Sequence, residues 1–177
     1  MRRHEVILVS AQDEEIGVME KMEAHQKGLL HRAFSVFIFD KSGRMLLQQR
    51  AAQKYHGGLL WTNACCSHPF PGEGIEDAAE RRLQEELGFT TSLQKAFCFT
   101  YKAEVENNLI EHEFDHVFVG EYEGEMKLNE DEVAAVAYHG MEEVKKLLED
   151  RPAFFTTWFR IAFPQIECWW QKNYVAV

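Results

Sequence analysis

The 177-residue chain is 46% hydrophobic, which predicts one domain, residues 1–177, with enough apolar side chains for a core. Its formal net charge of −10 argues against a nucleic-acid binder, because such proteins need a basic surface. No apolar run could span a membrane and the start lacks a signal peptide, so we expect a cytoplasmic protein. The four cysteines have no paired ligand spacing, which indicates free thiols.

The first predicted elements along the chain are strands. Residues 6–9 read as a short strand, followed by a polar turn at 12–14. Residues 33–39 are apolar on both alternating faces, which is typical of a central strand covered on both sides. After a turn at 40–43, residues 45–49 return as a second strand.

The clearest predicted helix runs from about residue 73 to 87. Acidic residues crowd its start and Gly88 follows its end, as helix termini prefer. Its apolar stripe repeats every fourth residue, at Ile75, Ala79, Leu83 and Leu87.

The second half of the chain mixes strands with helices. Apolar residues alternate over 97–105, and a further strand is expected over 110–119. Residues 141–148 and 153–163 are predicted to be helical. Mixed strands and helices with short connections predict an α+β, or layered α/β, fold.

Two short segments carry groups suited to chemistry. Cys66 and His68 lie two residues apart, and so do Glu111 and Glu113. In an extended backbone such residues point to the same side, so each pair is aimed at one place. Cys65 then faces the opposite way and is the natural core cysteine. A thiol, imidazoles and carboxylates together predict a proton-transfer site.

The face that carries Glu111 and Glu113 continues with Asp115 and then with Val117 and Val119. Acidic residues give way to apolar ones on one face, which points the carboxylates toward a half-buried region. The alternative is an edge strand with its polar face in solvent, since acidic residues are mostly exposed. The sequence leaves both readings open.

Three histidines adjoin predicted strand ends or loops near apolar sequence: His25, His31 and His68. With Glu111 and Glu113 they would form a three-histidine, two-carboxylate site. That ligand mixture suits Zn²⁺, Mn²⁺ or Fe²⁺ better than Ca²⁺. A lone histidine is usually structural or simply exposed, and spacing alone is a weak signal for a metal site.

The end of the predicted helix, residues 81–89, resembles the Nudix motif, and Glu73 fits the earlier glutamate of that motif. Arg82 stands where the motif has a further glutamate. In Nudix hydrolases these glutamates hold Mg²⁺ against a diphosphate. The loss of one glutamate suggests that the fold and the diphosphate site are kept while the reaction differs. An ordinary amphipathic helix with i,i+4 ion pairs is the alternative.

Nearly the whole chain, from Glu20 to Trp158, resembles type I isopentenyl-diphosphate isomerases. The resemblance rests on residues 24–35, residues 61–69, the degenerate Nudix helix, and the pair Glu111 and Glu113. Ser67 departs from the family, which has glycine between the cysteine and the histidine. The resemblance implies a Nudix-like fold of mixed sheets packed between helices. It also implies interconversion of isopentenyl and dimethylallyl diphosphate through a tertiary carbocation.

The same resemblance assigns roles residue by residue. The proton-transfer residues would be Cys66 and Glu113, on opposite faces of the substrate, assisted by Tyr101. The substrate-binding residues would be Lys21, Arg50, Lys54 and Arg82 at the diphosphate and Trp158 at the cation. One divalent metal, Mn²⁺ or Zn²⁺, would be held by His25, His31, His68, Glu111 and Glu113. A Mg²⁺ ion would meet the diphosphate through Glu86.

Two other functions compete with isomerisation. A Nudix-type hydrolase would cleave a nucleoside diphosphate derivative, but it would need a glutamate where Arg82 stands. A non-enzymatic diphosphate-binding module would tolerate loss of Cys66 and Glu113. The expected partner is a small-molecule diphosphate, with no nucleic acid and no membrane, and the sequence leaves monomer and homodimer open.

Overall fold

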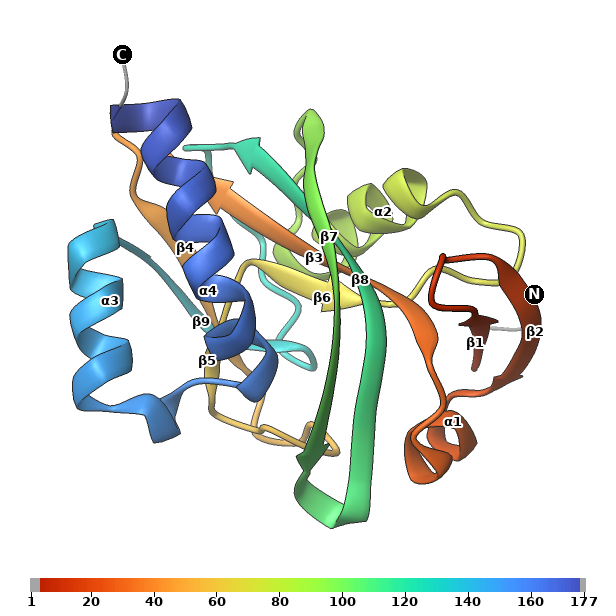
Figure 1. Ribbon diagram of the computed structural model, residues 1–177. Helices are drawn as coiled ribbons and strands as arrows, with labels where there is room; N and C mark the ends of the chain where they lie inside the picture. The colour runs from red at the N-terminus through yellow and green to blue at the C-terminus, as the bar shows by residue number, and fades with distance from the viewer. Residues whose placement is uncertain (1–3, 176–177) are drawn as a thin grey trace.

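A nine-stranded mixed sheet organises residues 4–175, the part of the chain that the computed structural model describes (Figure 1). The predicted domain limits, 1–177, extend beyond the described residues. Residues 1–3, part of the N-terminal segment considered for a signal peptide, also lie outside them. The strands are β1 (Glu5–Val9), β2 (Glu15–Glu20), β3 (His31–Phe39), β4 (Met45–Arg50), β5 (Trp61–Thr62), β6 (Cys65–Ser67), β7 (Leu93–Val105), β8 (Leu109–Glu121) and β9 (Val133–His139).

Four α-helices accompany the sheet: α1 (Lys21–Lys27), α2 (Ile75–Leu87), α3 (Met141–Asp150) and α4 (Thr157–Trp170). Two 3₁₀ turns (Glu106–Asn108 and Pro152–Phe154) and a short π-helix (Gln171–Val175) complete the described elements. Within residues 4–175, none of the helices combines the length and apolarity that crossing a bilayer requires.

Strand β3 is the centre of the sheet. It pairs antiparallel with β1, β4 and β6 and parallel with β8, and β8 pairs antiparallel with β7. The parallel register runs from His31 opposite Glu113 to Phe39 opposite Glu121. Because strands 31–39 and 109–121 are far apart in the chain, their pairing joins two distant functional segments.

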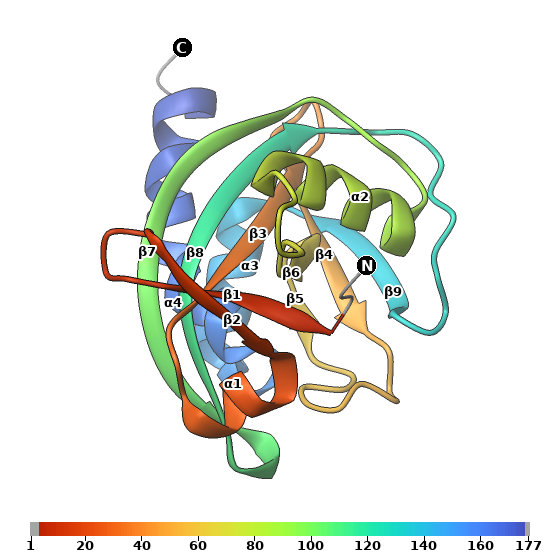
Figure 2. The same cartoon turned by 90° about the vertical axis from the view of Figure 1, so that its right-hand side faces the viewer.

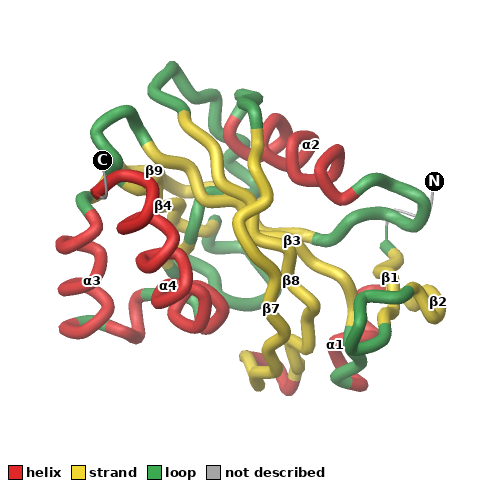
Figure 3. The backbone as a smooth tube through the Cα atoms, turned by 45° about the horizontal axis from the view of Figure 1, so that its top comes forward, coloured by secondary structure: helices red, strands yellow, loops and turns green. Residues whose placement is uncertain are grey.

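Helices cover both faces of the sheet, with α3 and α4 on one side and α2 on the other (Figure 3). Alternate residues of β3 feed the two cores: Phe37 packs with Phe159 of α4, whereas Val36 packs with Leu83 of α2. Burial of each such side chain stabilises the fold by about 2 kcal/mol. The predicted central strand and the α+β class with sheets between helices are confirmed.

Helix α2 begins at Ile75, two residues after the predicted start, and ends where predicted. Gly88 adopts a left-handed conformation (φ 75°), and a Cβ there would lie 2.6 Å from the carbonyl oxygen of Lys127. Only glycine fits this turn. Ala79, Leu83 and Leu87 of the predicted stripe are fully buried.

The prediction of a helix over 153–163 is wrong at both ends. Residues Pro152–Phe154 form a 3₁₀ turn, and Phe155 is extended because it bridges to Trp61 of β5. The helix starts at Thr157, where the Thr156 side chain caps it, and continues to Trp170. Strands β2 and β9 and helix α1 were not predicted.

Candidate active site

Three neighbouring strands place a row of polar side chains on the face covered by α4. Glu113 of β8 lies between His31 of β3 and Tyr101 of β7. The Tyr101 hydroxyl lies 2.7 Å from Oε2 of Glu113 and 3.1 Å from Oε2 of Glu111, so it can donate a hydrogen bond to either carboxylate. Glu111, Glu113 and Asp115 are all buried. The alternative of an edge strand with solvated carboxylates is therefore wrong.

Four of the predicted metal ligands converge. The ligand atoms of His25, His31, His68 and Glu113 lie within 4.8 Å of one another. The Nδ1 atoms of His25 and His31 are 2.7 Å and 2.8 Å from backbone carbonyl oxygens, which leaves each Nε2 for an ion. The buried Nε2 of His25 has no hydrogen-bond partner. This orphaned atom and the nitrogen-rich donor set fit a divalent metal such as Zn²⁺ or Mn²⁺.

The fifth predicted ligand, Glu111, lies outside that group of four. Its Oε1 is 3.4 Å from Nε2 of His56, and its other oxygen faces Tyr101. Burial and the neighbouring Glu113 raise the pKa of Glu111 to about 8. Burial opposes ionisation of Glu113 too, but hydrogen bonds to His31 and His68 hold its pKa well below the usual range. A metal role for Glu111 stays a prediction.

The Cys66 thiol is surrounded by hydrogen-bonding groups. Its Sγ lies 3.0 Å from Oδ1 of Asn63, to which it donates, and 3.1 Å from Nε1 of Trp158, from which it accepts. Burial and the nearby Asp115 raise the pKa of Cys66 to about 12, so the thiol keeps its proton at neutral pH. Cys65 is fully buried in the opposite core, as predicted.

Ser35 and Asp115, which sequence reasoning did not assign to the site, lie behind this thiol. Ser35 is paired with Cys66 across β3 and β6, with Oγ 3.5 Å from Sγ, and it donates to Asp115 over 2.7 Å. Burial and Glu113 raise the pKa of Asp115 to about 8. The signal in the sequence is the position of Asp115, on the same strand face as Glu111 and Glu113.

The proton-transfer candidates Cys66, Tyr101 and Glu113 line one cavity together with Trp158. A second cavity adjoins the first, because the two share part of their lining. The shared residues include three predicted diphosphate ligands, Lys21, Lys54 and Arg82, together with Tyr55, Ser67 and His68. The basic side chains therefore stand where the two cavities meet. We call the cavity lined by Cys66 and Glu113 the inner chamber and the adjoining cavity the outer chamber.

The remaining predicted ligands lie deeper. Arg50 lines the inner cavity, where its guanidinium carbon is 5.0 Å from the centre of a Trp158 ring. Glu86 is buried next to the cavity-lining Arg82, with which it pairs, and it accepts a hydrogen bond of 2.9 Å from Gln48. Its role toward Mg²⁺ stays a prediction.

Comparison with known proteins identifies the family. The sequence matches the NUDIX domain over residues 29–159. It is 47% identical over 167 residues to the isopentenyl-diphosphate Delta-isomerase of Pectobacterium atrosepticum, covering 94% of this chain and 93% of that protein. It is 50% identical over 154 residues to the enzyme of the same name from Serratia proteamaculans, covering 87% and 86%. The chain belongs to the isopentenyl-diphosphate Delta-isomerase family.

Solved structures agree on the fold of this isomerase-family chain. A protein from Deinococcus radiodurans superposes with a TM-score of 0.69 at 16% identity, covering 83% of this chain and 90% of that one. A MutT protein from Methanosarcina mazei gives 0.64 at 19% identity, covering 81% and 95%. The predicted Nudix-like fold and the assignment as an enzyme of the isomerase class are confirmed.

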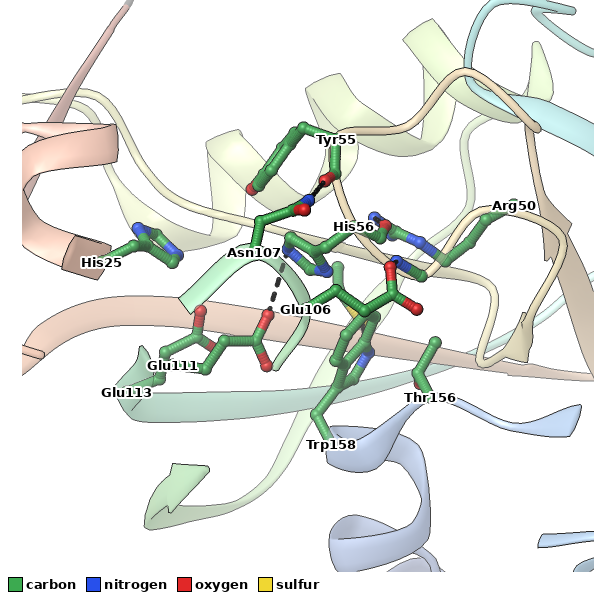
Figure 4. A network of polar contacts seen from close by, with 12 residues as sticks. His25, Arg50, Tyr55, His56, Glu106, Asn107, Glu111, Glu113, Thr156 and Trp158 are labelled. Atoms are coloured by element: carbon green, nitrogen blue, oxygen red, sulfur yellow. Dashed lines mark hydrogen bonds and ion pairs between the residues drawn. The ribbon is translucent and has the colours of Figure 1, made fainter. Parts of the chain in front are cut away.

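A loop formed by residues 51–60 closes one wall of the isomerase site, and the tip of the β7–β8 hairpin holds it (Figure 4). The Asn107 side chain donates to the carbonyl oxygen of Tyr55 over 2.7 Å, and Glu106 accepts from the backbone N–H of Gly57 over 3.1 Å. The loop carries Lys54 and also His56, a residue that sequence reasoning missed. Burial and Arg50 lower the pKa of His56 to about 3, so its imidazole is neutral.

Proposed function

We propose that this chain interconverts isopentenyl diphosphate and dimethylallyl diphosphate, with Cys66 and Glu113 exchanging protons on opposite faces of the allylic unit. The observation that carries the proposal is the shared inner cavity, which both side chains line from different strands. A hydrolase needs only the diphosphate chamber, whereas a thiol and a carboxylate that line one cavity beside the Trp158 ring serve proton transfer to carbon.

The reaction moves a double bond by adding one proton and removing another. A proton added to the terminal methylene carbon gives a tertiary cation, and loss of a proton from the carbon next to the diphosphate-bearing carbon forms the new double bond. The protonated Cys66 thiol and the ionised Glu113 carboxylate, hydrogen-bonded to Tyr101, supply the two proton-transfer groups. When the thiol gives its proton and Glu113 takes the other, one internal proton transfer from Glu113 to Cys66 returns the enzyme to its starting protonation state.

The cation between the two steps needs a non-nucleophilic surrounding. Trp158 is 94% buried from solvent and lines the cavity, so its ring offers a π surface to the cation. Because its indole N–H is bound to the Cys66 sulfur, the ring is held beside the thiol. Exclusion of water by these buried groups protects the cation from capture.

The diphosphate would lie at the junction of the two chambers. Lys21, Lys54 and Arg82 all reach that junction. Lysine and arginine in a cluster compensate for the net charge of −10 when an anion binds. Bound there, the diphosphate directs the five-carbon chain into the inner chamber, where Arg50 adds a further positive charge.

Two divalent metals complete the proposal. His25, His31, His68, Glu111 and Glu113 would hold Mn²⁺ or Zn²⁺, and Glu86 would hold Mg²⁺ at the diphosphate. Bound at the histidines, such an ion would supply positive charge beside Glu113, which would favour the ionised carboxylate. The expected cytoplasmic location stays a prediction, and monomer and homodimer both stay open.

The proposal is tested by incubating the purified protein with isopentenyl diphosphate in deuterated water and following the mixture by NMR. We expect dimethylallyl diphosphate with deuterium at the protonated carbon. Cys66→Ala and Glu113→Gln should abolish isomerisation while the chain stays folded, and Cys168→Ser, on the exposed surface, is the control. Release of phosphate without allylic product would favour the hydrolase, and full turnover in either variant would overturn the assigned roles.

A further inference from the structure

A second thiol network lies on the opposite face of the β7–β8 pair from Glu113. Cys98 of β7 and His116 of β8 are directly opposite each other in the antiparallel register, and Sγ lies 3.5 Å from Nδ1 of the imidazole. The other ring nitrogen, Nε2, lies 2.9 Å from Oδ2 of Asp13. Cysteine, histidine and aspartate thus form one continuous chain of contacts.

Asp13 reaches this face from the turn between β1 and β2, which passes across β8 toward β7 (Figure 2). Its backbone is in the left-handed region (φ 63°). Arg32 of β3 fixes the residue twice, through Nε to Oδ1 over 2.7 Å and through Nη2 to the backbone carbonyl over 2.6 Å. One carboxylate oxygen is therefore held by Arg32, and the other is presented to His116.

This arrangement sets the tautomer of His116. The carboxylate of Asp13 accepts a hydrogen bond, so Nε2 carries the proton and Nδ1 presents its lone pair to the Cys98 thiol. Burial lowers the pKa of His116 against the opposing effect of Asp13, while Lys95 and Arg32 lower it further. A neutral imidazole oriented in this way can take the thiol proton.

The alternatives fit the geometry less well. A metal cannot be shared by the three side chains, because Cys98 and Asp13 approach different nitrogens of one ring. An ion pair of Arg32 with Asp13 would suffice to fix the turn, but it does not require a thiol opposite the imidazole. Cys98 is half-buried, whereas Cys65 is fully enclosed, so Cys98 is the more accessible residue of the two.

We propose that Cys98 is a modification site, activated by His116 and Asp13, that forms mixed disulfides with low-molecular-weight disulfides. The thiol proton passes to Nδ1 of His116 while the sulfur attacks one sulfur of the disulfide. The disulfide bond breaks, a new bond joins Cys98 to that sulfur, and the departing thiolate takes the proton from the imidazole. One disulfide and one protein thiol give one mixed disulfide and one free thiol.

The test is the rate at which each cysteine of the folded full-length chain reacts with oxidised glutathione, measured by mass spectrometry of its peptides. We expect Cys98 to react about tenfold faster than Cys168, although Cys168 is the more exposed. His116→Gln and Asp13→Asn should each lower the rate at Cys98 by about tenfold and leave Cys168 unchanged. In urea-unfolded chain the two thiols should react at similar rates.

Equal rates at Cys98 and Cys168 in the folded chain, or an unchanged Cys98 rate in His116→Gln, would overturn the proposal. Isomerase activity of each variant reports whether it is folded, since none of these residues lines the reaction cavity. If His116→Gln fails to fold, Asp13→Asn decides in its place. Failure of this inference leaves the proposed isomerisation untouched, because the two thiols lie on different faces of the sheet.

Discussion

The indole Nε1 of Trp158 donates a hydrogen bond to Sγ of Cys66 over 3.1 Å. This contact joins helix α4 to strand β6 at the reactive end of the cavity. Trp158 thereby has two separable features, a ring face that lines the cavity and an N–H that orients the thiol. Phenylalanine keeps the first feature and removes the second.

Trp158→Phe should lower kcat by about fivefold, because loss of one hydrogen bond costs about 1 kcal/mol in positioning the thiol. KM should change little, since phenylalanine keeps a ring beside Arg50 and the other diphosphate ligands lie at the junction of the two cavities. Steady-state kinetics checks this, with Trp169→Phe on the same helix as the matched control. A wild-type kcat in Trp158→Phe would show that the indole N–H does not orient the thiol.

Tyr101→Phe removes the hydroxyl that two buried carboxylates share. Hydrogen bonds to charged groups are worth about 1.5–3 kcal/mol, so we expect kcat to fall by roughly ten- to a hundredfold. Tyr138→Phe removes a hydroxyl from β9, remote from the site, and serves as the control. Equal losses in both variants would mean that the effect is on the fold rather than on proton transfer.

Asn107→Gly should raise KM by about fivefold with little change in kcat, because it releases the loop that carries Lys54 at the cost of about 1 kcal/mol. Glycine preserves the left-handed backbone at this position (φ 62°). Asn108→Gly, at the neighbouring left-handed position (φ 58°), is a closely matched control. The result to look for is a difference in KM between the two glycine variants.

Removal of divalent metal by a chelator should abolish turnover and lower the Tm. A ligand present at a hundred times its Kd stabilises a protein by about 2.7 kcal/mol, and that stabilisation disappears with it. His25→Gln should reduce the metal-dependent rise in Tm, whereas His112→Gln should not, because His112 turns away to the backbone of Gly28. A Tm that ignores both chelator and added Mn²⁺ or Zn²⁺ would contradict the histidine site.

Glu73 makes stability depend on pH. Burial raises its pKa, but hydrogen bonds from Arg81 and from the backbone of Phe70 outweigh this and lower it below 4.5. The contribution is therefore fully present above about pH 4.5 and is lost as the pH falls through the lowered folded pKa. Glu73→Gln should cost about 1 kcal/mol of unfolding free energy at neutral pH and progressively less in acid.

Urea unfolding of the wild-type chain and of Glu73→Gln at several pH values checks this predicted difference in unfolding free energy. The partly exposed Arg81–Glu85 contact provides the control, because Glu85→Gln removes a weaker and more solvated ion pair. A cost of Glu73→Gln that is independent of pH would show that the charge of Glu73 is not the stabilising feature.

The local parts of the site could be predicted from the sequence because strand alternation is a local rule. Cys66 and Glu113 face the site, while Cys65 and His112 turn away, as expected from the i and i+2 spacing. The covered central strand and helix α2 were found for the same reason, since their apolar periods are complete within one segment.

What the sequence could not supply depends on contacts between distant segments. His56 belongs to a loop whose position is set by Asn107 and Glu106 of another hairpin. Helix α1, which positions Lys21 and His25, has only seven residues, and this segment is too short for its apolar periodicity to be recognised. The start of α4 was missed because Phe155 is drawn into an extended bridge with Trp61.

The pairing of β3 with β8 has a consequence for how the enzyme is assembled. Since His31 is opposite Glu113 in this parallel register, a slip by one residue would turn either strand's functional side chains to the other face. The same slip would send Phe37 or Val117 out of the core beneath α4. Apolar packing at one end of the strand pair therefore fixes the register at the polar end. A chain that packs Phe37 and Val117 into the core also places His31 opposite Glu113.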